Sequence, residues 1–340
     1  MPRGQMNGAG SETGGLRAVS RGAVGRHAPS PYTRVVDTPI SPQGDLGRVQ
    51  AALETILVGK AESVRLALCC ALAGGHLLLE DVPGVGKTTL AYGLQAVLGL
   101  GFTRLQFTAD LLPADVIGVS IFDPEARDFT FHRGPIFTQL LLADEINRAT
   151  PKTQSALLEA LAEGQVTVDG TPHRLPQPFF VVATQNPHHQ VGTFALPESQ
   201  MDRFLMRLTL GYPDRAAERQ ILTGGDRRAM ARQQAPLLSA ADLLAWRERV
   251  QAVRCSEALL DYIQDLLAAS RAQPDWDGGF SPRAGLALRD AARAHAVLKG
   301  RDYGLPEDVQ AVAVAVLAHR LPLTDAEREV RRLLESVAVP

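Results

Sequence analysis

The chain has 340 residues, of which 45% are hydrophobic and 21% charged, and its formal net charge is -2 at pH 7. This length is enough for about two domains, and the near-neutral charge gives no global signal for nucleic-acid binding. No apolar run approaches the ~20 residues that a membrane-spanning helix needs. The three cysteines form no C-x-x-C pair and no disulfide framework, so we expect a cytoplasmic protein with reduced thiols.

Residues 1–44 are rich in Gly, Pro and Ser and lack hydrophobic periodicity, which predicts a disordered tail. Its five arginines outnumber its two acidic residues. A solvated tail is the simplest interpretation, and contact with an anionic partner stays open. The segment lacks the compact apolar region of a signal peptide.

Two amphipathic helices are predicted at 46–57 and 62–72, with Val58-Gly59 as the break between them. A short apolar strand follows at 77–79. The next segment, 83–89, reads Pro-Gly-Val-Gly-Lys-Thr-Thr, and a helical pattern then runs to Gly99. A strand, a glycine-rich turn, Lys-Thr and a helix form the layout of a phosphate-binding loop.

The chemistry of this loop follows from its residues. Gly84 and Gly86 let backbone N–H groups turn towards an anion, and the helix start adds its positive dipole end. Lys87 would place a charge on the terminal phosphates, and the Thr88 hydroxyl could ligate Mg²⁺. Asp81 stands where the general motif has its first glycine. The predicted nucleotide-binding residues are Val58, Gly59, Pro83, Gly84, Val85, Gly86, Lys87, Thr88 and Thr89.

Further along, Arg104 to Phe107 reads as a strand and 108–118 as a helical piece. Two hairpins are predicted, at about 119–131 and at 166–173, the second with an Asp-Gly turn. The first hairpin is either a solvent-facing excursion or a loop that contacts a substrate or partner.

Buried strands are predicted at 137–143, 179–183 and 204–210, and they alternate with helices. This pattern predicts an α/β fold with a parallel, doubly wound sheet sandwiched by helices, over residues 45–212. Past Pro213 the strand signal stops, and a smaller all-α lid domain is predicted over 213–340. Its helical stretches are 214–223, 239–252, 256–271, 282–299, 306–320 and 325–338.

Polar residues follow the ends of the predicted strands, where open α/β sheets bind ligands. Asp144 could hold Mg²⁺, and Glu145 could polarise a water for attack on a γ-phosphate. Asn186 could orient that water, although an Asn before a proline also suits a turn.

Two arginines complete the predicted site. Arg203 lies just before the last strand, where it could reach the site of a neighbouring subunit and stabilise transition-state charge. An ordinary salt bridge to Asp202 or Glu198 is the alternative. Arg283 starts a helix of the α domain and could contact the γ-phosphate, in cis or in trans, or could be a surface residue.

Together these residues resemble the AAA+ ATPases, and more narrowly the MoxR group. The resemblance covers about 45–340. It rests on seven segments in a fixed order: 78–88, 106–118, 134–137, 141–149, 183–187, 196–204 and 280–284.

The resemblance implies a Mg²⁺-dependent ATPase that assembles as a ring, usually a hexamer. It matches Lys87, Thr88, Asp144, Glu145, Asn186, Arg203 and Arg283 to the phosphate-loop, metal, base, first-sensor, finger and second-sensor positions. It also implies that the hairpins contact substrate or pore, and that the acidic residue at 81 is a family variant. Members act as chaperone-like factors that remodel, mature or insert cofactors or metals into client proteins, commonly with a partner that carries a von Willebrand factor A domain.

Two other functions remain as alternatives. One is the motor subunit of a metal chelatase, which has a similar architecture. The other is a nucleic-acid-associated AAA+ motor, which the near-neutral charge and the lack of a helix-turn-helix appendage disfavour.

Overall fold

The computed structural model describes residues 42–125, 127–186 and 192–340. The predicted tail lies outside these ranges, apart from its last three residues, which begin the first helix. Residues 41–340 form one compact unit by their contacts. The predicted boundary between core and lid at 212/213 therefore stays a prediction. No helix among the described residues is long and apolar enough to cross a membrane.

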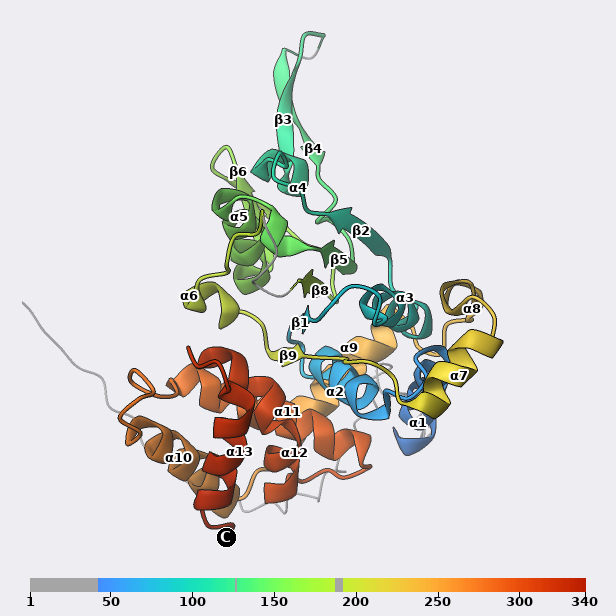
Figure 1. The fold of residues 1–340 in the computed structure, drawn as a ribbon. Coiled ribbons are helices and arrows are strands. Elements are labelled where there is room, and N and C mark those ends of the chain that lie inside the picture. Colours follow the sequence, from blue (N-terminus) through green and yellow to red (C-terminus); the bar gives the residue numbers. More distant parts are fainter. Residues whose placement is uncertain (1–41, 126, 187–191) are drawn as a thin grey trace, which may run out of the picture. The chain divides into compact units, whose positions relative to one another are not determined.

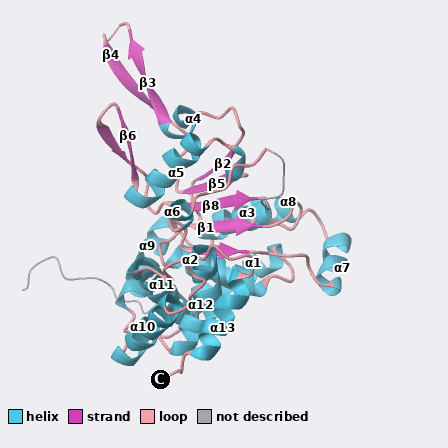
Figure 2. Cartoon of the chain, turned by 60° about the vertical axis from the view of Figure 1, so that its left-hand side comes forward, coloured by secondary structure: helices cyan, strands magenta, loops and turns pink. Residues whose placement is uncertain are grey.

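Within the described residues, five strands form one sheet in the order β2-β5-β8-β1-β9, and every neighbouring pair is parallel (Figures 1 and 2). This confirms the predicted α/β fold. The strands are β1 (Leu77–Glu80), β2 (Phe102–Gln106), β5 (Leu140–Asp144), β8 (Phe180–Gln185) and β9 (Met206–Leu208).

The helices of the first half are α1 (Pro42–Ile56), α2 (Ala61–Leu72), α3 (Lys87–Leu98), α4 (Pro113–Ile117), α5 (Pro151–Glu163) and α6 (Glu198–Met201), with a 3-10 turn at Ile146–Arg148. Those of the second half are α7 (Arg215–Thr223), α8 (Arg227–Gln233), α9 (Ala240–Ala252), α10 (Glu257–Arg271), α11 (Pro282–Leu298), α12 (Pro306–Leu317) and α13 (Ala326–Ser336), with a 3-10 turn at Ala318–Arg320.

The three inner strands, β5, β8 and β1, are buried almost throughout, and since successive side chains point to opposite sides, both faces of the sheet are covered there. Leu77 and Leu79 pack with residues of α1, α2, α3 and the C-terminal helices. Leu78, between them, packs on the other face with residues of α4 and α5. The uninterrupted apolar runs of the sequence are therefore strands between two helical layers.

Two hairpins leave this core. One is β3 (Gly118–Asp123) with β4 (Asp128–Arg133), and the other is β6 (Gln165–Val168) with β7 (Thr171–Arg174). The first extends away from the sheet (Figures 1 and 2). The rings of Phe131 and His173 stack with centroids 4.0 Å apart, so the two hairpins support each other.

The structure differs from the sequence-based expectation in several places, among them the short helix α6, which was not predicted. Only Pro113–Ile117 of the expected helical piece at 108–118 is helical, because Pro113 fixes where the helix starts. Helix α8 was not predicted. Its sequence, RRAMARQ, buries only Ala231 and so shows no apolar periodicity.

Candidate active site

The loop between β1 and α3 has the conformation that its glycines allow. Gly84 and Gly86 have φ angles of 91° and 106°, a region that side chains other than glycine rarely adopt. A Cβ on Gly86 would also lie 3.0 Å from the side chain of Leu57, the residue after α1. Helix α3 starts at Lys87, directly after this turn, so its first N–H groups face the loop.

Asp81 has a structural role that explains its place in the loop. Its carboxylate accepts hydrogen bonds from the backbone N–H of Val82 at 2.7 Å and of Gly211 at 2.6 Å. Asp81 therefore fastens the start of the loop to the segment that follows β9. A glycine at this position would lack both bonds.

Lys87 is mostly buried beneath the loop. Its ammonium donates to the carbonyl oxygens of Asp81 and, at 3.1 Å, of Val82. Burial lowers the pKa of Lys87 from its usual value, while the carboxylates of Asp81 and Asp144 act in the opposite direction. The positive charge of Lys87 is thus held within the loop, where it would meet a bound phosphate.

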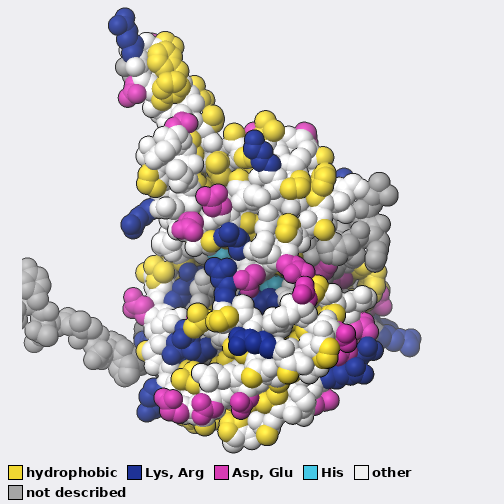
Figure 3. All heavy atoms as spheres, turned by 90° about the vertical axis from the view of Figure 1, so that its left-hand side faces the viewer, with side chains coloured by type: hydrophobic (Ala, Val, Ile, Leu, Met, Phe, Trp, Pro, Cys, Tyr) yellow, Lys and Arg dark blue, Asp and Glu magenta, His cyan; other side chains and the backbone are white. Residues whose placement is uncertain are grey.

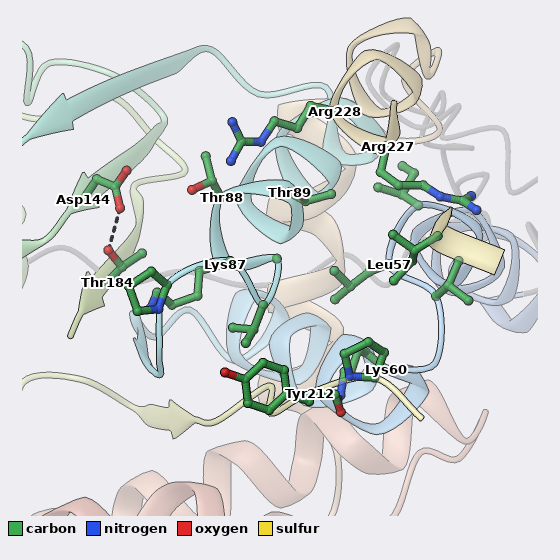
Figure 4. Close-up of a pocket in the computed structure, with 18 of the residues that line it drawn as sticks. Leu57, Lys60, Lys87, Thr88, Thr89, Asp144, Thr184, Tyr212, Arg227 and Arg228 are labelled. Carbon is green, nitrogen blue, oxygen red and sulfur yellow. Dashed lines mark hydrogen bonds between the residues drawn. The ribbon is translucent and has the colours of Figure 1, made fainter. Parts of the chain in front are cut away.

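The loop lines a cavity of about 780 Å³, a size typical of ligand sites. Every residue from Pro83 to Thr89 lines it, and so do Val58, Asp144, Glu145 and Asn186. Figure 4 shows Lys87, Thr88 and Asp144 around this space. Gly59 does not line the cavity. It has a φ of 73°, and a Cβ there would lie 2.6 Å from Ala217 of α7, so this glycine lets α7 approach the turn between α1 and α2.

Asp144 ends β5 and is held from two sides. Thr184 of β8 donates its hydroxyl to Asp144 Oδ1 at 2.6 Å (Figure 4). Arg104 of β2 donates to Oδ2 through Nε at 3.1 Å and a terminal nitrogen at 2.7 Å. A carboxylate has about four lone-pair positions, so three bonds leave one on Oδ1.

Glu145 stands next to Asp144 with a backbone φ of 56°, a conformation that costs a non-glycine residue about 1 kcal/mol or more. Its N–H donates to the Thr184 hydroxyl at 2.9 Å. Its carboxylate accepts from Asn186 Nδ2 at 3.2 Å and pairs with Arg148 at 3.1 Å. These contacts fix the position of the Glu145 carboxylate at the cavity.

Asn186 is fixed by a second asparagine. Asn147 is fully buried, donates to the Asn186 carbonyl at 3.0 Å and accepts from its N–H at 3.4 Å. The Asn186 side chain is thereby free to meet Glu145. The structure thus brings Lys87, Thr88 and both acidic residues together with Asn186 around one cavity.

Arg203 and Arg283 lie elsewhere in the chain. Neither lines the cavity of the phosphate loop; both line a second depression, with Asp202 and Arg320. Asp202 accepts from Arg320 Nε at 2.8 Å and pairs with Arg283 at 3.3 Å. Within the described residues, the Arg203 guanidinium makes no hydrogen bond or ion pair. Figure 3 shows Lys and Arg side chains gathered in the middle of this face.

Several residues of the cavity were not predicted from the sequence. They are Thr184, Arg104, Lys60, Tyr212, Arg227 and Arg228. The sequence held a signal for Thr184, because it lies two residues before Asn186 at the polar end of the same strand. Arg227 and Arg228 come from the unpredicted helix α8, so only the fold reveals them.

Thr88 and Asp144 offer a hydroxyl and a carboxylate oxygen, the hard oxygen ligands that Mg²⁺ prefers. The open lone pair of Asp144 Oδ1 fits this role. No group of three or more His, Cys, Asp or Glu side chains among the described residues could hold a metal alone. Mg²⁺ sites beside phosphates commonly use only one or two protein ligands, together with phosphate oxygens and water.

Comparison with known proteins supports this picture. A family model described as "ATPase family associated with various cellular activities (AAA)" matches residues 76–206, and one described as an AAA lid domain matches 268–337. The chain is 41% identical over 314 residues to Chaperone MoxR1 of Mycobacterium tuberculosis, with 87% of this chain and 82% of the relative covered. It is 34% identical over 309 residues to Protein MoxR of Paracoccus denitrificans, with 84% and 91% covered.

The chain belongs to the MoxR family of AAA+ ATPases. It is also 44% identical over 303 residues to the uncharacterised protein YeaC of Bacillus subtilis, covering 87% and 95% of the two chains. Among solved structures, a putative ATPase from Cytophaga hutchinsonii superposes with a TM-score of 0.76 at 36% identity, covering 88% of this chain and 96% of that one. The MoxR-family chain is accordingly an ATP hydrolase.

Proposed function

We propose that this MoxR-family ATPase couples Mg²⁺-dependent ATP hydrolysis to the remodelling or maturation of a client protein, including insertion of a cofactor or metal. The observation that carries the proposal is the meeting of Lys87, Thr88, Asp144, Glu145 and Asn186 around one cavity. These residues supply the parts that phosphoryl transfer to water needs: a phosphate cradle, oxygen ligands for a metal, and a base.

In this mechanism the loop N–H groups and Lys87 hold the phosphates. Thr88 and Asp144 would hold Mg²⁺, which neutralises charge on the β- and γ-oxygens when bound. Glu145 accepts a proton from the attacking water. Asn186, whose amide lies 3.2 Å from the Glu145 carboxylate, orients the same water.

The position of Arg203 supports a site shared between subunits. Its guanidinium lies outside the cavity of its own chain, at the depression that also holds Arg283. In a ring, usually a hexamer in this family, this face would meet the nucleotide of the next subunit, and both arginines would act in trans. An arginine that reaches a phosphoryl-transfer site from a neighbouring subunit accelerates the reaction by about 10³–10⁵-fold.

A client role rests on the family and on the hairpins. Relatives carry the names Chaperone MoxR1 and Protein MoxR. Phe122 and Phe129 of the β3–β4 hairpin are 50% and 66% exposed, and exposed aromatic side chains are typical of protein contacts. We propose that this hairpin contacts the client, and that a protein with a von Willebrand factor A domain acts as partner.

The test uses Glu145→Gln, with Glu159→Gln on the exposed side of α5 as the matched control. Glu145→Gln should bind ATP normally and lose at least about 10²-fold in turnover, because the base is gone. Turnover within threefold of the wild type would refute the assignment of the base.

The shared site is tested by mixing variants. Arg203→Ala should lose turnover and keep its affinity for ATP. Mixing it with Glu145→Gln should restore activity, since an intact base then meets an intact arginine across the subunit boundary. Absence of recovery at every mixing ratio would show that Arg203 does not act in trans.

A further inference from the structure

Five lysine and arginine side chains line the cavity among the described residues, and their partners differ. Lys87 donates to carbonyls of its own loop, and Arg104 pairs with Asp144. Lys60 donates to the Tyr212 carbonyl at 2.7 Å. Each of these three cations thus already donates to an acceptor within the chain.

The other two are neighbours at the start of α8. Arg227 donates to the carbonyls of Thr55 at 3.2 Å and Gln220 at 3.0 Å. The Arg228 guanidinium, in contrast, has no hydrogen bond or ion pair to any described residue, although its side chain lines the cavity. Figure 4 shows it reaching from α8 towards Thr88.

Helix α8 is held firmly enough to aim this side chain. Asp226 caps the helix by accepting from the Arg228 N–H at 2.8 Å. Ala231 is fully buried where α8 packs on α3 and α1, and Arg232 lies over the Tyr92 ring of α3 with its guanidinium carbon 5.3 Å from the centroid. The Arg228 side chain is thus directed to the cavity from a fixed helix.

We propose that Arg228 binds the phosphate tail of the nucleotide, from the same chain, next to Thr88. An uncommitted guanidinium beside the phosphate loop matches the geometry of phosphate oxygens, which it can bind in bidentate fashion. Arg228 is then the arginine that contacts the phosphates from within the same chain. Arg283 lines the other depression and does not line this cavity. The proposal rests on the assignment of the phosphate loop as the nucleotide site.

The experiment measures equilibrium binding of AMPPNP, ADP and AMP to the full chain by calorimetry in the presence of Mg²⁺. Three variants are compared: Arg228→Gln, Arg228→Lys, and Arg219→Gln as the control. Arg219 is an exposed arginine of α7 that does not line the cavity. Lys87→Ala serves as the test of the loop itself.

Arg228→Gln should weaken AMPPNP and ADP about tenfold, the effect expected of one charged hydrogen-bonded contact, and AMP less than twofold. The affinity of Arg228→Lys for AMPPNP and ADP should lie between those of the wild type and Arg228→Gln. Arg219→Gln should have the affinity of the wild type. AMPPNP affinity within twofold of the wild type in Arg228→Gln, or an equal loss for AMP, would overturn the proposal. Normal AMPPNP binding by Lys87→Ala would instead show that the phosphate loop is not the nucleotide site.

Discussion

Thr184 offers the sharpest test of how the carboxylates of Asp144 and Glu145, the proposed metal ligand and base, are placed. It is fully buried, donates its hydroxyl to Asp144 and accepts the N–H of Glu145. One oxygen atom thus fixes the side chain of the first acidic residue and the backbone of the second. Thr184→Val removes that atom and keeps the volume of the side chain.

The size of the effect follows from these two bonds. A hydrogen bond to a charged group contributes about 1.5–3 kcal/mol, and a buried N–H left without an acceptor costs about 1–3 kcal/mol. The Glu145 backbone already has a strained φ of 56°, and this N–H helps to hold it there. We therefore expect Thr184→Val to lose about 3 kcal/mol of stability and about 10–100-fold in kcat.

The assay compares ATP turnover, nucleotide affinity in EDTA and thermal unfolding for wild type, Thr184→Val and Thr184→Ser. Thr184→Ser retains the hydroxyl and should stay within about threefold of the wild type in turnover. Affinity in EDTA should not change, because the loop and Lys87 are untouched. Wild-type kcat in Thr184→Val would refute the argument that this hydroxyl positions the carboxylates.

Two further predictions concern stability and client contact. His76 is buried, accepts from the Val181 N–H at 3.1 Å, and burial lowers its pKa from 6.5 to about 4. As the pH falls, the unfolded chain takes up a proton on His76 before the folded chain does, so the free energy of unfolding should fall by roughly 3 kcal/mol between pH 6.5 and 4. In His76→Asn, the free energy of unfolding from denaturant titrations should depend less on pH over this range. Replacing Phe122 and Phe129 with Ser should leave basal turnover unchanged and abolish stimulation by a client; full stimulation would exclude the hairpin as the contact.

The sequence predicts the sheet and the phosphate loop well because their signals are local. Leu77–Leu79 is a continuous apolar run, and the glycine-rich turn with Gly86-Lys87 follows a few residues later. Asp144 and Asn186 were placed together because parallel strands end at the same edge of a sheet.

The rest of the site depends on contacts between distant segments. Arg104 meets Asp144 across 40 positions, and Arg228 reaches the cavity only because α8 packs on α3. The place of Arg283 was left open for the same reason. Its helix start was visible in the sequence, but its neighbour Asp202 is 81 positions away.

Asp202 holds two arginines that differ greatly in exposure. Its carboxylate is shared: Arg320, whose side chain is 6% exposed, holds one oxygen, and Arg283, which is 63% exposed, pairs with the other. If Arg283 leaves for a phosphate of the next subunit, the buried pair stays intact. Breaking the exposed pair costs less than about 1 kcal/mol. The Arg283 side chain can therefore exchange Asp202 for another anion while the Arg320–Asp202 pair, next to Arg203 in the chain, stays in place.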